Sequence, residues 1–191
     1  MVIDLHSGGT SPLYLPCCLI RVGKTAAETA QLIELMHAFG APIGSISDGS
    51  GGGGATTLSA TAQALGIPAL ATELGGGASL SRAGETLARD GVLRVLKHMG
   101  ILPAAIVEPA GPTRSMRVDG RQAFTYAPVR GIFEPAVTLG DEVRAGDLAG
   151  TIHPIAGPSE SARSVQFAQS GLVACQRARH LPSPETACLS W

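Results

Sequence analysis

The stretch MVIDLHSGG, residues 1–9, places a short apolar run directly before a histidine and two glycines. Residues 2–5 predict a buried β-strand, and the apolar run ends at His6. Because successive side chains of a strand point to opposite faces, Asp4 and His6 point the same way. An imidazole backed by a nearby carboxylate is typical of a metal ligand. The alternative is an ordinary solvated histidine at a strand end.

Downstream of this stretch, helix-like and strand-like segments alternate, with glycines between them. Apolar periodicity and glycine stops predict helices and strands in turn over residues 24–39, 42–47, 55–65, 67–74 and 82–99. Strands that alternate with helices of this length indicate an α/β layer, with helices packed on a sheet.

The pattern of predicted secondary structure changes at the proline-rich segment 108–112. Residues 122–155 contain short β-like runs with glycine between them, which predicts a small sandwich or barrel. The segment 127–146 resembles half of a biotinyl or lipoyl carrier motif, but the only lysines of the chain are Lys24 and Lys97, so the carrier lysine is absent. We therefore expect an α/β domain over 1–110 and an all-β module over 111–191.

Composition limits the classes of partner. Hydrophobic residues make up 45% of the 191 residues, the formal net charge is −1 and aromatic residues are 4%, so we expect neither nucleic acid nor membrane as a partner. A small molecule is the expected partner. The sequence leaves open whether the chain forms a homo-oligomer. The four cysteines show no CxxC spacing, which favours reduced, buried thiols, and we expect a cytoplasmic protein.

A second stretch, PALATELGGG over residues 68–77, places Glu73 at the end of an apolar strand. A carboxylate there suits a general base, although a structural ion pair is an equally ordinary role. The glycine run 49–54 lies between a strand and a helix and satisfies the GxGxxG pattern. This opens a nucleotide-binding alternative in which Glu73 holds a ribose. A flexible loop is the commoner explanation of such a run.

Taken together, these segments resemble the succinylglutamate desuccinylase/aspartoacylase family, and most closely the branch that removes the acetyl group from N-acetyl-diaminobutyrate. The resemblance lies in residues 3–9, 68–77, 91–93, 96–100, 126–135 and 170–177. The family consists of zinc-dependent deacylases with a carboxypeptidase-like mixed sheet and flanking helices. The resemblance implies a hydrolase of acylated amino acids, with Zn²⁺ as cofactor, His6 as the last zinc ligand and Glu73 as the general base. Both side chains should then face one cleft.

The chain also departs from the family pattern. In the family an HxxE segment and an Asn-Arg pair precede the DLH strand, and neither is found in these 191 residues. We therefore expect the C-terminal part of a deacylase, with its other zinc ligands upstream, and we expect this part to be inactive alone. The alternatives are an inactive truncated remnant and, less favoured, a nucleotide-binding α/β domain.

Overall fold

The chain forms two compact units in the computed structural model, which describes residues 1–50, 54–118, 120–155, 160–177 and 187–190. The first unit comprises Met1–Ser7, Pro16–Gly75 and Ser79–Asp119, and the second comprises Gly8–Leu15, Gly76–Ala78 and Gly120–Trp191. The expected division at residues 110 and 111 therefore differs from the structural one. Strand pairing explains two of the differences: β6 (Arg114–Arg117) joins the sheet of the first unit, and β2 (Pro12–Tyr14) joins a sheet of the second.

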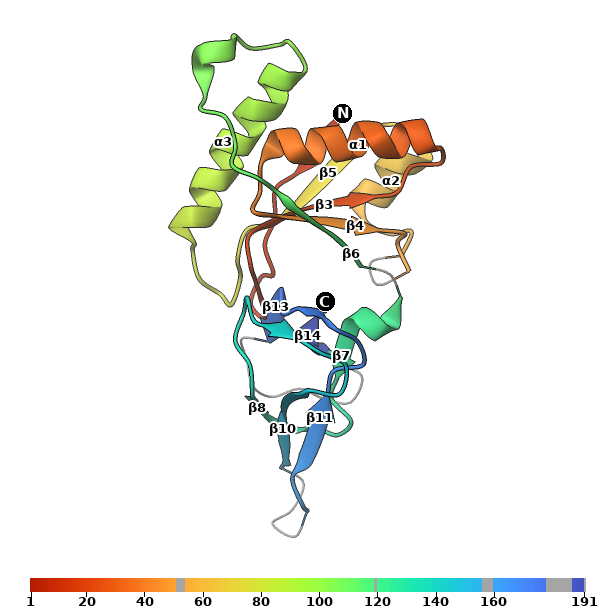
Figure 1. Cartoon of the computed structure of the whole chain (residues 1–191), viewed down its shortest axis with the longest axis vertical. Helices are drawn as coiled ribbons and strands as arrows, with labels where there is room; N and C mark the ends of the chain where they lie inside the picture. The colour runs from red at the N-terminus through yellow and green to blue at the C-terminus, as the bar shows by residue number, and fades with distance from the viewer. Residues whose placement is uncertain (51–53, 119, 156–159, 178–186, 191) are drawn as a thin grey trace. The chain divides into compact units, whose positions relative to one another are not determined.

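A five-stranded mixed sheet forms the centre of the first unit (Figure 1), with the strand order β1-β5-β3-β4-β6. The strands are β1 (Val2–Asp4), β3 (Cys17–Arg21), β4 (Ile43–Ser47), β5 (Ala69–Glu73) and β6 (Arg114–Arg117). β1 is parallel to β5, and β3 is parallel to β4, but β5 and β3 are antiparallel. This is the α/β class with a mixed sheet that the sequence and the resemblance predicted.

Three helices accompany this sheet: α1 (Ala26–Phe39), α2 (Leu58–Ala64) and α3 (Arg82–His98). Two side chains cap the start of α1: the hydroxyl of the N-cap residue Thr25 accepts from the amide of Glu28, and the Glu28 carboxylate accepts from the amide of Lys24, just before the helix. No helix in the described part of the chain is long and apolar enough to cross a membrane.

The core of the first unit lies between the sheet and α1. Its buried side chains come from β3, α1, β5 and α3, and include Cys18, Ile20, Leu32, Leu35, Met36, Phe39, Leu70 and Val95. Gly91 of α3 allows the Phe39 ring to approach the helix, since a Cβ at Gly91 would lie 2.5 Å from that ring. The strand β3 is not among the predicted elements, although both of its cysteines are fully buried.

The second unit is built from short antiparallel strands, as predicted for an all-β module. Its sheets have the orders β2-β13-β14-β7, β11-β10-β8 and β12-β9. The strands are β2 (Pro12–Tyr14), β7 (Phe124–Tyr126), β8 (Gly131–Pro135), β9 (Glu142–Val143), β10 (Leu148–Pro154), β11 (Arg163–Gln166), β12 (Gly171–Leu172), β13 (Cys175–Arg177) and β14 (Ala187–Ser190). Phe133, Ile152 and Val173 belong to its apolar core. Short 3-10 turns, η1 (Ala104–Ile106) and η2 (Arg121–Ala123), complete the described elements.

Buried cysteines occur in both units. Cys17, Cys18 and Cys175 are buried and are not joined in disulfides, which agrees with the expectation of reduced, buried cysteines at these three described positions. Burial raises the pKa of the Cys18 thiol to about 12. This thiol is therefore protonated at neutral pH and serves as a packing group.

Candidate functional site

The parallel pairing of β1 and β5 brings two polar side chains together where the two strands end. Val2 pairs with Ala69 and Asp4 pairs with Ala71, so this register continued by two residues brings His6 to the level of Glu73. His6 follows the end of β1, and Glu73 ends β5. The Nε2 atom of His6 lies 3.6 Å from Oε1 of Glu73. The expected proximity of these two side chains is confirmed.

Asp4 holds the other side of the imidazole. Its Oδ1 atom lies 3.2 Å from Nδ1 of His6, close enough for Nδ1–H to donate to the carboxylate. This pairing follows from the strand itself, because residues two positions apart share a face. The ring is thereby oriented with Nε2 towards Glu73, which is the arrangement expected of a histidine ligand with a supporting carboxylate.

The electrostatics of the site are dominated by the two carboxylates around one imidazole. The side-chain interaction with Glu73 raises the pKa of His6 from 6.5 to about 9; partial burial opposes this rise and Asp4 adds to it. At 3.6 Å the contact with Glu73 is longer than an ordinary hydrogen bond, so we ascribe its effect mainly to opposite charge. Both carboxylates thus favour the protonated form of the imidazole.

Glu73 is the most enclosed of the three side chains, with 13% of its side chain exposed against 42% for His6. Its Oε2 atom is buried and has no hydrogen-bond partner among the described residues. A buried carboxylate oxygen without a donor is costly, so this atom is available to a ligand, a water molecule or a transferred proton.

The main chain around the two side chains is held by Thr72, a residue that the sequence interpretation did not single out. Thr72 is fully buried, and its Oγ1 atom accepts from the amide of His6 at 3.1 Å. The amide of Leu74 donates to the carbonyl oxygen of His6 at 3.0 Å. A hydroxyl inside an otherwise apolar strand was the available signal in the sequence.

A complete metal shell is not assembled by the described part of the chain, in which no three His, Cys, Asp or Glu residues are placed to hold a metal ion. The geometry explains this, because Asp4 and Glu73 flank different nitrogens of the His6 ring. These residues fit a metal in part: Nε2 of His6 is one suitable ligand, and Glu73 lies directly beside it.

The described residues that flank the glycine run proposed for nucleotide binding lie at the opposite end of the sheet strands. β4 runs antiparallel to β5, so its end at Ser47 is far from Glu73. Gly51–Gly53 lie outside the described residues, and the carbonyl of Gly54 accepts from the Arg21 guanidinium at 2.6 Å. Glu73 therefore lies at the other end of the sheet from Ser47 and Gly54, and the described residues give no support to a shared nucleotide site.

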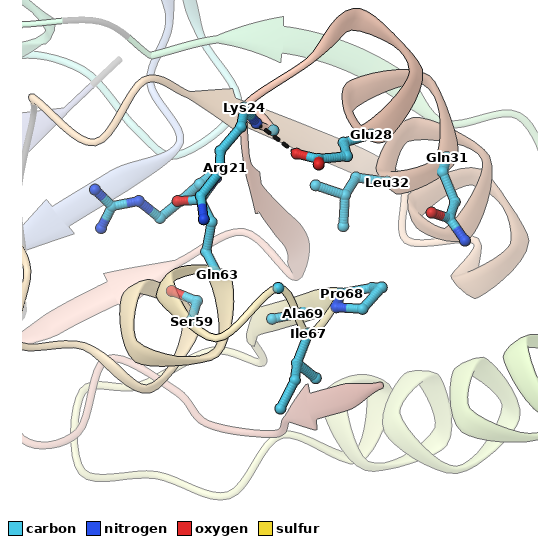
Figure 2. A pocket seen from close by; sticks show the side chains of 12 residues that line it. Arg21, Lys24, Glu28, Gln31, Leu32, Ser59, Gln63, Ile67, Pro68 and Ala69 are labelled. Carbon is cyan, nitrogen blue, oxygen red and sulfur yellow. Dashed lines mark hydrogen bonds between the residues drawn. The ribbon is translucent and has the colours of Figure 1, made fainter.

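A small cavity of about 120 Å³ lies at the same end of the strands as Arg21, opposite to the end that carries Glu73 (Figure 2). It is lined by α1, α2 and the start of β5, and its polar groups already hold the fold together: Glu28 caps α1, and the Gln63 amide donates to the carbonyl of Val22. Ala69 lines it, and Glu73 lies four residues along the strand, about 13 Å away at about 3.3 Å per residue. The cavity is therefore separate from the candidate site.

Comparison with known proteins gives one consistent family. Residues 1–99 match the family model of the succinylglutamate desuccinylase/aspartoacylase catalytic domain. Over 178 residues the chain is 25% identical to N-alpha-acetyl-L-2,4-diaminobutyric acid deacetylase from Halomonas elongata, and this alignment covers 93% of the chain and 51% of the relative.

Two solved structures show the same fold. The succinylglutamate desuccinylase/aspartoacylase from Rhodobacter sphaeroides is 28% identical, with a TM-score of 0.87 over 99% of this chain and 57% of the other. The product-bound ectoine utilization protein EutE (DoeB) from Ruegeria pomeroyi is 25% identical, with a TM-score of 0.88 over 98% of this chain and 56% of the other. The chain therefore spans about half the length of the relatives that it matches.

Proposed function

Since this chain belongs to the succinylglutamate desuccinylase/aspartoacylase family of deacylases, we propose that it carries part of a zinc-dependent active site that cleaves the amide of an N-acylated amino acid. The observation that supports this proposal is the contact of His6 Nε2 with Glu73 Oε1 at 3.6 Å, beside a buried carboxylate oxygen that has no described partner. A metal-ligand candidate and a proton acceptor are thus side by side.

In this proposal His6 supplies one zinc ligand through Nε2, and Asp4 fixes the ring by accepting from Nδ1–H. Catalytic zinc normally has three protein ligands and one open position. The described residues offer one and the sequence contains no HxxE segment, so we propose that the other ligands lie outside the described part of the chain. When bound, zinc would polarise the acyl carbonyl and make a water molecule more acidic.

Glu73 is the proposed general base. It takes a proton from the attacking water as the bond from the water oxygen to the acyl carbon forms. It then returns that proton to the amine nitrogen as the carbon–nitrogen bond breaks, so the products are a carboxylic acid and a free amine. Partial burial supports this role, because a shielded carboxylate close to the reacting atoms transfers protons without competition from bulk water.

The proposed substrate class comes from the relatives. One relative is named as a deacetylase of N-alpha-acetyl-L-2,4-diaminobutyric acid, and a structural neighbour as an ectoine utilization protein. We therefore propose an N-acetyl-diaminobutyrate-like substrate, and we propose that the 191 residues alone do not turn it over because the zinc shell is incomplete.

A chimera tests this function. The segment of the Rhodobacter sphaeroides relative that precedes the matched region is fused in front of Met1, and release of acetate from N-acetyl-diaminobutyrate is measured with zinc present. We expect turnover by the chimera and none by the chain alone. Turnover by the chain alone, with zinc retained stoichiometrically after dialysis, would contradict the proposed incomplete site.

Matched variants of the chimera separate the two roles. Glu73→Gln should keep zinc but lose turnover by about a hundredfold or more, because an amide cannot accept the proton. His6→Ala should lose zinc and turnover together. Glu34→Gln and His98→Ala change exposed residues of the same types and should leave both measurements near the parent values. Near-normal turnover of Glu73→Gln would assign the base to another residue.

A further inference from the structure

Thr72 is a polar side chain in an apolar layer. Its neighbour on the same face of β5 is Leu70, and its partner across the sheet is Cys18 of β3, and all three are fully buried. A hydroxyl in such surroundings destabilises the fold unless it is hydrogen bonded. The role of this hydroxyl therefore follows from the groups with which it forms hydrogen bonds.

The hydrogen bonds of the Thr72 hydroxyl go to the end of β1. Oγ1 accepts from the amide of His6 at 3.1 Å, and its single proton is shared between the carbonyl oxygens of Asp4 and His6, each at 3.3 Å. One buried side chain thus contacts the main chain of both residues that form the imidazole–carboxylate pair.

The regular ladder between β1 and β5 changes at this point. The amide of Val2 donates to the carbonyl of Pro68, and in a parallel pair this pattern repeats every two residues. The amide of His6 would accordingly donate to the carbonyl of Thr72, but it donates to the Thr72 hydroxyl. The side-chain oxygen replaces one main-chain oxygen, while the next bond of the ladder, from the amide of Leu74 to the carbonyl of His6, is kept at 3.0 Å.

We propose that Thr72 is a positioning residue, whose hydroxyl fixes the end of β1 so that the His6 ring is held between Asp4 and Glu73. The role deepens the proposed function and rests on it for its catalytic meaning. Thr72 directly precedes Glu73 in β5. The same short segment of the strand therefore carries the proposed base and, through the Thr72 hydroxyl, holds the main chain of the residue that carries the imidazole.

The test uses the zinc-free full chain and three substitutions at this position and its neighbour. Thr72→Val removes the hydroxyl at nearly constant volume, and Thr72→Ser keeps it. Cys18→Ala weakens the same core layer without touching β1, and so controls for general destabilisation. Hydrogen–deuterium exchange of the His6 amide and long-range ¹H–¹⁵N spectra of the His6 ring are the readouts, with thermal unfolding recorded for each variant.

We expect Thr72→Val to exchange the His6 amide about tenfold faster and to change the ring spectrum, because the amide loses its acceptor. Thr72→Ser and Cys18→Ala should keep the parent exchange rate within about twofold and the parent ring spectrum. If Thr72→Val does not fold, Thr72→Ala compared with Thr72→Ser gives the same contrast. A folded hydroxyl-free variant with an unchanged His6 amide and ring overturns the proposal.

The two proposals fail in different ways. The spectra are recorded without zinc or substrate, so an inactive chimera would remove the deacylase function and leave the positioning role standing. An unchanged His6 in Thr72→Val would remove the positioning role while turnover of the chimera could still be measured.

Discussion

Replacement of Glu73 by glutamine should flatten the pH dependence of stability. The interaction with Glu73 raises the pKa of His6 in the folded chain to about 9, from 6.5. The protonated ring therefore stabilises the fold fully below pH 6.5, and this stabilisation is lost as the pH rises through about 9. The difference of about 2.5 pH units corresponds to at most about 3.4 kcal/mol. Solvent screening of a ring that is 42% exposed reduces this to about 1–2 kcal/mol.

The assay is urea unfolding followed by circular dichroism at pH 6, 7.5 and 9, in buffer that contains a chelator to keep zinc away. The parent chain should lose about 1–2 kcal/mol of its free energy of unfolding across this range through His6. Glu73→Gln should lose less than half of that, since only Asp4 then favours the protonated ring. Glu34→Gln, an exposed control, should behave like the parent. Equal pH slopes in the parent and Glu73→Gln would refute the reasoning.

Three further predictions concern packing, thiol chemistry and the sheet edge. Gly91→Ala should destabilise the chain by about 1–3 kcal/mol in urea unfolding, because the added methyl meets the Phe39 ring. Gly111→Ala, where the methyl meets nothing, should change little. Iodoacetamide should label Cys18 only after unfolding, as mapped by mass spectrometry, since this thiol is buried and protonated. Leu5→Lys should reduce self-association in sedimentation velocity, because a charge beside the outer edge of β1 opposes strand pairing between copies. Leu80→Lys, a substitution of an exposed loop leucine, should not reduce it.

The sequence predicted the helices and the site strands well because their signals are local. α1 and α3 carry apolar periodicity between a Thr or Ser cap and a glycine stop, and their observed ends differ from prediction by one or two residues. The strand ends at His6 and Glu73 were visible because each apolar run stops at a polar residue followed by glycines. That the two ends meet was implied by the family resemblance, since local patterns do not specify which strands pair.

Features that depend on pairing between distant segments were not predictable in this way. Residues 8–15 belong to the second unit because β2 pairs with β13, although they lie between strands of the first unit along the chain. The strand β3 is short and includes two cysteines, which gave neither an alternating nor a helical pattern. The contact of Thr72 with His6 joins positions 66 apart and follows from the register of two strands.

The pairing of the first strand with β5 also has a kinetic consequence. The hydrogen bond between His6 and Thr72 closes a loop of 66 positions, whereas β3, α1 and β4 follow one another directly along the chain. Contacts between distant positions form late, since the entropy of loop closure has to be overcome first. During folding, the helix–sheet core can therefore form before β1 is added at its edge. In pulsed hydrogen exchange, we expect the amides of β1 to become protected after those of α1, so that His6 and Glu73 meet after the helix has formed.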